Sequence, residues 1–334
     1  MRKIIVTIIF LALLIILAGI LYYQRIIKPS QNAVPDQGKT YQRIISLSPN
    51  ITEILFALGL GDRIIGVTRF CNYPPEAKEK MQVGGYLDPN YEAILSLNPD
   101  VVIILPEFDS IRNFLSELGI KYLTVSNKTI SDILSSIDYL GKEFGIEQQA
   151  EHILTDIRSK INQIEKKTKD SIRPKILIVV ERTMGTGVIE DVYVAGKNTF
   201  FDELLKMAGG INAFEDEKIS YPILSAEGII HINPDFIIEL VPQLEQTGLS
   251  QSLLEKDWQS LPQINAVKNN RITIMCHDYA VVPGPRFILF LEDLARTIHP
   301  EIDWDKLRTS LSSWHRGEVK LGALINERQS LISQ

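Results

Sequence analysis

Aromatic and polar side chains follow several short apolar runs of this sequence, in positions where they could bind a small ligand. An aromatic ring offers a flat apolar face, while imidazole, hydroxyl, carboxylate and guanidinium groups can bind a polar or metal-bearing molecule. If the apolar runs are parallel strands, their carboxyl ends meet at one edge of a sheet, where α/β proteins bind ligands. The residues in this position are Phe70, Cys71, Glu107, Phe108, Arg182, Thr183, His277, Asp278 and Tyr279.

Three further residues are candidates for ligand contact. Tyr86 and Tyr221 lie six residues before Glu92 and Glu227, respectively, in two segments of similar sequence. A tyrosine could place its ring against a macrocycle and its hydroxyl against an amide or a metal, although core packing would also explain either residue. Arg286 follows a Pro-Gly-Pro sequence and would begin a helix, where it could bind an anionic group of a ligand or form a surface ion pair.

Several other kinds of site are not supported by the sequence. The five histidines are scattered without metal-binding spacing, so we expect no bare-metal site and no resident cofactor. P-loop and G-x-S-x-G patterns are absent, and Glu190 stands where a dinucleotide fingerprint starting at Gly185 would need its third glycine, so we expect no enzyme. The formal net charge of −6 argues against nucleic-acid binding. We expect Cys71 and Cys276 to be free thiols, since they would fall in different lobes.

The segments that carry these candidates predict strands alternating with helices. Residues 50–53, Asn-Ile-Thr-Glu, form a candidate capping box for a helix that ends at Gly59. Further helices are predicted near residues 200–208 and from about Pro285. Such alternation indicates parallel α/β sheets. The predicted strands are 43–48, 64–67, 101–105, 122–125, 175–180, 236–240 and 271–275.

An internal repeat indicates that the chain folds into two similar halves. Residues 86–101 match residues 221–236 at an offset of 135, sharing a Tyr, a Glu, an Ile and an Asn-Pro-Asp sequence. A looser match, at an offset of 150, aligns Glu53 with Glu203, together with a Leu and a Gly that follow each. A shared helix–turn–strand connection would explain any one of these coincidences, but six of them at the single offset of 135 argue against chance.

A single long helix would join the two halves. No Gly or Pro occurs from Glu147 to Lys169, and apolar residues recur there at helical spacing. We therefore predict an α/β protein of two Rossmann-like lobes with parallel sheets, joined by one long α-helix, with the ligand cleft between the lobes. The predicted boundaries are 43–146 for the N-terminal lobe, 147–171 for the interlobe helix and 172–334 for the C-terminal lobe.

The N-terminus carries a membrane or export signal. The apolar run from Ile4 to Tyr23 would span about 30 Å as a helix, which is the thickness of a bilayer core. A cleavable signal peptide is the alternative, although its apolar region is usually shorter. We predict that residues 1–27 form this anchor or signal segment, that residues 28–42 form a flexible stalk, and that the rest of the chain lies outside the cytoplasm.

Four motifs together resemble the class III periplasmic binding proteins, the helical-backbone receptors for vitamin B12, ferric siderophores or haem. These motifs begin at Arg43 (Arg-Ile-Ile-Ser-Leu-Ser-Pro), Asn72 (Asn-Tyr-Pro-Pro-Glu-Ala), Glu92 and Glu227, and the motif at Asn72 is most similar to the B12 binders. The resemblance implies a long interlobe helix with small closure on ligand. It also implies that Glu92 and Glu227 dock on the two permease subunits, although each could be a solvated carboxylate near a helix N-terminus.

The sequence therefore predicts an extracytoplasmic substrate-binding protein of an ABC importer, either membrane-anchored or secreted. Its ligand would be a small-molecule metal chelate, with a corrinoid expected before a ferric siderophore or haem. Its partners would be an ABC permease dimer with a cytoplasmic ATPase. An anchored chelate sensor without a transporter is an alternative that the sequence leaves open.

Overall fold

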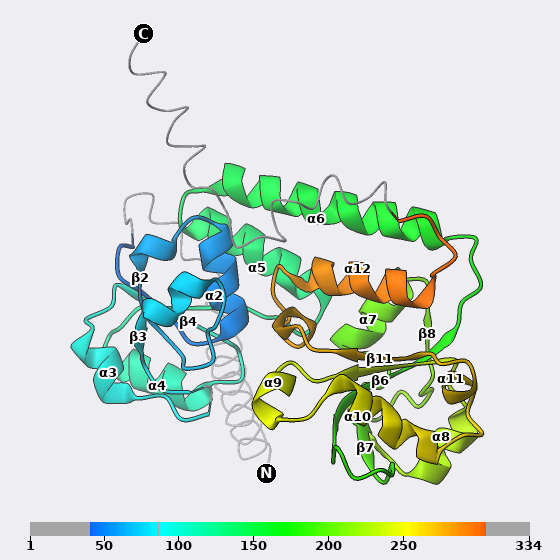
Figure 1. Ribbon diagram of the computed structural model, residues 1–334. Coiled ribbons are helices and arrows are strands. Elements are labelled where there is room, and N and C mark those ends of the chain that lie inside the picture. Colours follow the sequence, from blue (N-terminus) through cyan, green and yellow to red (C-terminus); the bar gives the residue numbers. More distant parts are fainter. Residues whose placement is uncertain (1–40, 86, 305–334) are drawn as a thin grey trace, which may run out of the picture. The chain divides into compact units, whose positions relative to one another are not determined.

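The computed structural model of the protein describes residues 41–85 and 87–304 of the 334-residue chain, and these belong to a unit that begins at Tyr41 (Figure 1). Tyr86, the expected anchor segment and most of the expected stalk lie outside the described residues. Within the part of the chain that is described, no helix has both the length and the apolar character needed to cross a membrane.

The first lobe is built on a parallel sheet with the strand order β3-β2-β1-β4-β5. The central strands β1 and β4 are fully buried and apolar except for Ser46, so both faces of the sheet require cover by helices. In chain order the elements are β1 (Ile44–Ser46), α2 (Pro49–Ala57), β2 (Ile64–Val67), β3 (Met81–Gln82), α3 (Tyr91–Ser96), β4 (Val101–Ile104), α4 (Asp109–Glu117), β5 (Tyr122–Thr124) and α5 (Ile130–Glu143).

The second lobe contains a sheet with the order β11-β10-β6-β7-β9, and β8 pairs with β6. Its buried centre is formed by β6 and β10, as β1 and β4 form the centre of the first sheet. In chain order the elements are β6 (Lys175–Arg182), β7 (Val192–Val194), α7 (Phe200–Met207), β8 (Ile211–Asn212), β9 (Ile223–Leu224), α8 (Ala226–Ile232), β10 (Phe236–Leu240), α9 (Leu244–Thr247), α10 (Gln251–Asp257), α11 (Asn265–Lys268), β11 (Ile272–Met275) and α12 (Phe287–Ile298).

The two-lobe α/β architecture is confirmed, but the second sheet is mixed rather than parallel. Strand β7 runs antiparallel to both β6 and β9. The connection from β6 to β7 covers only residues 183–191, which is too short for the crossover that a parallel neighbour requires. Gly185 and Gly187 in this connection have positive φ angles of 74° and 80°, which glycine adopts at no steric cost.

A single long helix, α6 (Glu147–Thr168), follows the first lobe and precedes the second, as predicted. It packs on α5 of the first lobe and on α7 and α12 of the second (Figure 1). The packing on α5 is tight, because a Cβ atom on Gly141 would overlap the Cβ of Ala150. Buried residues of both lobes and of α6 belong to one continuous hydrophobic core, so the helix packs against both lobes as well as connecting them.

The sequence repeat corresponds to a repeated structure. Asn98 and Asn233 each end a helix in the left-handed conformation, with φ angles of 43° and 48°. Two residues later, the carboxylate of Asp100 accepts a hydrogen bond from the backbone N–H of Arg43, which precedes β1, at 2.9 Å. The carboxylate of Asp235 likewise accepts from the N–H of Lys175, at the start of β6, at 2.9 Å. Each Asn-Pro-Asp sequence thus joins a helix to the strand beside the first strand of its lobe.

The prediction of a capping box at residues 50–53 is wrong. Helix α2 begins at Pro49 with Ser48 as its N-cap residue, so Asn50 is already inside the helix. Glu53 is therefore too far along the helix to reach the N-cap backbone, and its carboxylate binds Arg286 of the second lobe instead. The sequence pattern indicated the right helix, but this glutamate has a tertiary partner rather than a local one.

Candidate functional site

The loop that follows β2 places one predicted ligand residue at the surface and another in the core. Phe70 is 48% exposed, and the guanidinium carbon of Arg69 lies 5.0 Å from the centre of its ring. Arg69 is held by the carboxylate of Asp88 at 2.7 Å. Cys71 is buried, and its sulfur lies 3.1 Å from the hydroxyl oxygen of Thr52, so it packs inside the lobe. Burial raises the pKa of the Cys71 thiol.

A group of charged and aromatic side chains joins the two lobes. Arg286, the N-cap residue of α12, is buried and donates to both carboxylate oxygens of Glu53 on α2, at 3.0 and 2.5 Å. It also donates to both oxygens of Asp278, at 2.9 and 3.0 Å. The ring of Tyr73 covers the guanidinium at 3.7 Å, and the ring of Tyr279 lies 5.9 Å away. This interlobe cluster therefore consists of Glu53, Tyr73, Asp278, Tyr279 and Arg286.

One guanidinium lies between two carboxyl groups in the interlobe cluster, so the net charge of the cluster depends on whether Glu53 is ionised. Burial, opposed in part by Arg286, raises the pKa of Glu53 from its ordinary value of 4.5 to about 7. Burial also opposes ionisation of the half-exposed Asp278, but its hydrogen bonds and attraction to Arg286 outweigh this and lower its pKa. As the pH falls, the more deeply buried Glu53 is therefore protonated before Asp278.

The segment that follows β11 carries three of the predicted residues. His277 is exposed, and its ring stacks on that of Tyr279 with the centroids 4.8 Å apart. Tyr279 is buried, and its hydroxyl donates to Asp293 at 2.6 Å; burial and this bond raise its pKa. Asp278 is half-exposed and paired with Arg286. Of the three, His277 is the side chain most open to a ligand.

A second buried ion-pair network shapes the loop that follows β6. Arg182 is the last residue of β6 rather than a residue after it, and it is buried between Glu239 at 2.8 Å and Asp257 at 2.7 Å. The Asp257 carboxylate also accepts from the backbone N–H groups of Gly185 and Gly187, both at 2.7 Å. Arg182 is therefore paired within the lobe, and Asp257 fixes the loop that carries the exposed Thr183.

The carboxyl ends of β6 and β10 border a hollow of about 230 Å³. This is less than the roughly 300–1,000 Å³ that typical small-molecule sites occupy, so the hollow could hold part of a chelate but not all of it. Its lining residues are Val180, Glu181, Arg182, Met184, Glu239, Leu240, Val241, Pro242, Gln243 and Thr247.

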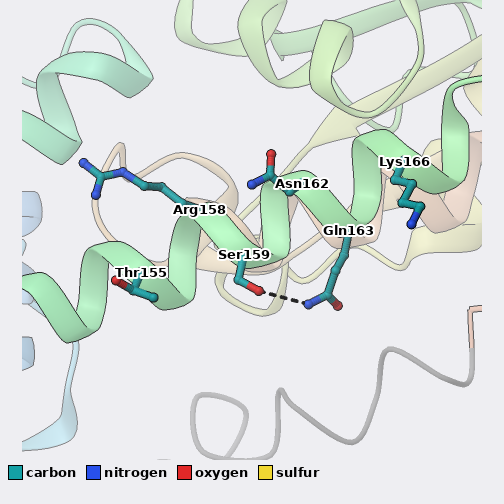
Figure 2. A pocket seen from close by; sticks show the side chains of 6 residues that line it. All are labelled: Thr155, Arg158, Ser159, Asn162, Gln163 and Lys166. Carbon is teal, nitrogen blue, oxygen red and sulfur yellow. Dashed lines mark hydrogen bonds between the residues drawn. The ribbon is translucent and has the colours of Figure 1, made fainter.

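A second hollow, of about 450 Å³, lies on the surface of α6 (Figure 2). All six lining side chains come from this one helix, and Gln163 donates to the hydroxyl of Ser159 at 3.1 Å. Groups from one helix do not converge on a ligand, so we assign this hollow no binding role. Its lining residues are Thr155, Arg158, Ser159, Asn162, Gln163 and Lys166.

The remaining predicted residues lie at the surface or near it. Glu107 is exposed and forms an ion pair with Lys128 at 2.9 Å. Burial raises the pKa of the Glu107 carboxyl, but the hydrogen bond and charge of Lys128 outweigh it, so the pKa is lowered. Phe108 is partly buried at the start of α4. Tyr221 is 50% exposed just before the edge strand β9. Cys276 accepts from the amide of Gln251 at 3.2 Å, and both cysteines are free thiols.

The two predicted docking glutamates are both exposed. Glu92 lies in the first turn of α3, whose N-cap residue Asn90 accepts from a backbone N–H. Glu227 lies in the first turn of α8, whose N-cap residue Ser225 does the same. The acidic side chains thus occupy matching positions of matching helices.

Sequence reasoning missed the residues that organise these loops. Tyr73 belongs to one of the four motifs but had no predicted role, and Asp257 was not among the candidates. Glu53 carried a usable signal, because it belongs to the weaker repeat at an offset of 150. The partner across the lobes, 233 positions away, could not be found from local sequence.

Comparison with known proteins decides the family. The profile of the periplasmic binding proteins matches residues 44–279. The chain belongs to the periplasmic binding protein family. An uncharacterized ABC transporter substrate-binding lipoprotein, YvrC, of Bacillus subtilis is 32% identical over 79% of this chain and 82% of its own.

Two further relatives have named ligands. The vitamin B12-binding protein of Vibrio cholerae is 26% identical over 76% of this chain and 87% of its own. The structure of the periplasmic heme-binding protein RhuT of Roseiflexus is 29% identical and covers 78% of this chain and 98% of its own, with a TM-score of 0.66. As a periplasmic binding protein, this chain serves an ABC transporter by binding substrate rather than by catalysis.

Proposed function

We propose that this chain captures a metal-bearing chelate, a corrinoid before others, and delivers it to an ABC permease. The ligand would lie between the strand-end loops of the two lobes. Likeness to the vitamin B12-binding protein of Vibrio cholerae supports this choice, since that relative is matched over 87% of its own length.

The observation that carries the proposal is the exposure of large aromatic rings among the predicted ligand residues of both lobes. Phe70 is 48% exposed after β2 of the first lobe, and Tyr221 is 50% exposed before β9 of the second. Rings of this size contribute most when a ligand covers them, because each can bury well over 100 Å². A flat macrocycle would cover such rings from both lobes.

The charges at the strand ends favour a largely uncharged ligand. Arg182 and Arg286 are each bound by two carboxylates, and Arg69 is bound by Asp88. The buried Arg182 and Arg286 are therefore not left to bind two acidic side arms such as the propionates of haem, and of the three only the exposed Arg69 could exchange its carboxylate partner for one of them. The amide groups around a corrin ring need only neutral or acceptor partners, which Thr183 and Asp278 supply.

Haem is the second candidate because one specific observation favours it. His277 exposes an imidazole whose ring is held against Tyr279. A neutral imidazole is a common axial ligand of haem iron. Likeness to the heme-binding protein RhuT, at 29% identity, adds to this alternative.

Delivery would use Glu92 and Glu227, one in each lobe, on the two subunits of a permease dimer that is driven by a cytoplasmic ATPase. Two exposed carboxylates at equivalent positions suit a partner with two-fold symmetry. We propose that the chain works outside the cytoplasm and that residues 1–27 hold it to the membrane or direct its export.

The ligand is tested by titrating the full-length protein, in detergent, with cobalamin, haem and a ferric siderophore. Binding is followed by visible absorbance and calorimetry. We expect cobalamin to bind most tightly, and we expect Phe70→Ala and Tyr221→Ala each to weaken it about tenfold, or about 1.4 kcal/mol. Leu118→Ala, which removes an equally exposed apolar side chain from the end of α4, is the control. Submicromolar haem binding without detectable cobalamin binding would replace the first proposal by the second.

A further inference from the structure

Glu53 and Glu203 occupy equivalent positions in the two lobes. Each lies six residues before a glycine that ends its helix in the left-handed conformation, Gly59 with φ 77° and Gly209 with φ 82°. The chain closes both helix ends in the same way, since the residue after each glycine donates to a carbonyl five positions earlier. The two glutamates are thus related by the internal repeat.

Each of these carboxylates binds the opposite lobe. Both carboxylate oxygens of Glu53 on α2 accept hydrogen bonds from Arg286 at the start of α12. Glu203 on α7 accepts from the backbone N–H of Ile130, the first residue of α5, at 2.7 Å. Helix α5 follows β5 in the first lobe, and α12 follows β11 in the second, so the two targets are also equivalent. The contacts are reciprocal.

The two targets lie directly after strand-end loops. Residues 125–129 connect β5 to α5, and residues 276–286 connect β11 to α12. Glu203 therefore ties the loop after β5 to the second lobe, and Glu53 ties the loop after β11 to the first. The second contact is close, because a Cβ atom on Gly284 would lie 3.0 Å from a carboxylate oxygen of Glu53.

Stability alone does not account for the contact at Glu53. Burying two charges costs about as much as their attraction returns, so a buried ion pair often adds little to the free energy of unfolding. Its geometry is nevertheless strict, with paired hydrogen bonds on two sides of a planar guanidinium. Such a contact specifies one arrangement of the lobes over others that would bury similar apolar area.

We infer that Glu53 and Glu203 form a reciprocal pair of positioning residues that holds the facing strand-end loops at a fixed separation and thereby sets the width of the ligand cleft in the free protein. The inference rests on the proposed function only in placing the ligand between the lobes. Neither glutamate needs to touch the ligand.

The test is a distance measurement on the ligand-free, full-length protein at pH 8, where Glu53 is ionised. Spin labels on a ketone-bearing unnatural amino acid at Glu117 of α4 and Lys256 of α10, both exposed, leave the native cysteines unchanged. Glu53→Gln places an amide N–H against Arg286 and so breaks the paired hydrogen bonds between the two side chains. Glu203→Ala removes the acceptor of the Ile130 N–H. We expect each variant to broaden the interlobe distance distribution and to move its mean by more than about 2 Å.

Three further variants make the outcome specific. Glu203→Gln keeps an acceptor for the Ile130 N–H and should retain the wild-type distance. Arg286→Lys keeps the charge but loses the paired hydrogen bonds, and it replaces Glu53→Gln if that variant does not fold. Glu292→Gln breaks a buried pair with Arg296 inside α12, and should lower the melting temperature without changing the distance.

Unchanged distances in folded Glu53→Gln or Arg286→Lys, or in Glu203→Ala, would overturn the inference, and so would an effect of Glu292→Gln as large as theirs. Because no ligand is present, these outcomes are independent of which chelate binds. A failure of the proposed function would leave the distance shifts in place.

Discussion

Glu92 and Glu227 lie two residues beyond the N-cap residues of α3 and α8, and each helix ends at an asparagine in the left-handed conformation six residues later. The same local structure therefore presents one exposed carboxylate from each lobe. Neither glutamate has an ion-pair partner among the described residues, so both charges are available to a partner protein.

We predict that these two carboxylates serve transport but not ligand capture. Glu92→Lys with Glu227→Lys should leave the dissociation constant of the isolated protein unchanged and should abolish uptake by cells that carry the permease. The reason is that like charges at a docking surface repel, whereas the cleft residues are untouched. Glu117→Lys is the control for charge reversal at another exposed site. A large loss of affinity in the double variant would place the glutamates in the cleft instead.

The raised pKa of Glu53 predicts a pH dependence of stability. A carboxyl group that titrates at about 7 in the folded protein and at 4.5 when unfolded contributes stability that is complete below pH 4.5 and is lost as the pH rises through 7. The groups facing it are Arg286 and Asp278, which stay charged over this range, and the thiol of Cys71 and the hydroxyl of Tyr73, which stay neutral.

The measurement is denaturant unfolding of wild type and Glu53→Gln from pH 4.5 to 7.5. Wild type should lose free energy of unfolding relative to the variant as the pH rises, by at most about 1.4 kcal/mol per pH unit. Glu292→Gln, measured in parallel, corrects for general effects of losing a buried carboxylate. A difference between wild type and Glu53→Gln that stays flat or grows with pH would show that Arg286 keeps Glu53 ionised throughout.

Asp257 should matter far more for stability than a comparable surface carboxylate. It binds Arg182 and two backbone N–H groups while fully buried, so Asp257→Asn leaves Arg182 short of a counter-charge and should cost about 3 kcal/mol in the free energy of unfolding. Asp88→Asn removes an exposed partner of Arg69 and should cost less than about 1 kcal/mol. Chemical denaturation measures both. Equal losses of free energy of unfolding in the two variants would mean that the buried network around Asp257 stabilises the protein no more than an exposed ion pair does.

The fold could be predicted largely because its signals are local. The apolar run Val101–Ile104 and the uninterrupted helical pattern from Glu147 onward each lie within one continuous segment, so each can be recognised without knowing the tertiary contacts. The antiparallel strand β7 was not predicted, since only three residues form it and its direction depends on pairing with β6.

The site was harder to predict because topology places residues at strand ends but does not say where their side chains point. Phe70, His277 and Tyr221 are open to solvent, as a ligand contact requires. Arg182, predicted from its strand end, and Arg286, predicted from its helix start, both turn inward to carboxylates 57 and 233 positions away in the sequence. A buried guanidinium needs such partners, and sequence spacing does not reveal them.

The last prediction concerns motion between the lobes. Helix α6 has 22 residues without Pro or Gly, and it packs on α5, α7 and α12 through one continuous core. A helix of this kind bends only gently unless Pro or a π-bulge interrupts it. Wide closure would also have to break the contacts of Glu53 and Glu203. We therefore expect the interlobe distance between labels at Glu117 and Lys256 to change only modestly when ligand binds, with the loops after the strands ordering most. Spin-label distances with and without saturating ligand check this. A change on the order of 10 Å, as in hinge-type domain closure, would show that α6 does not restrain the lobes.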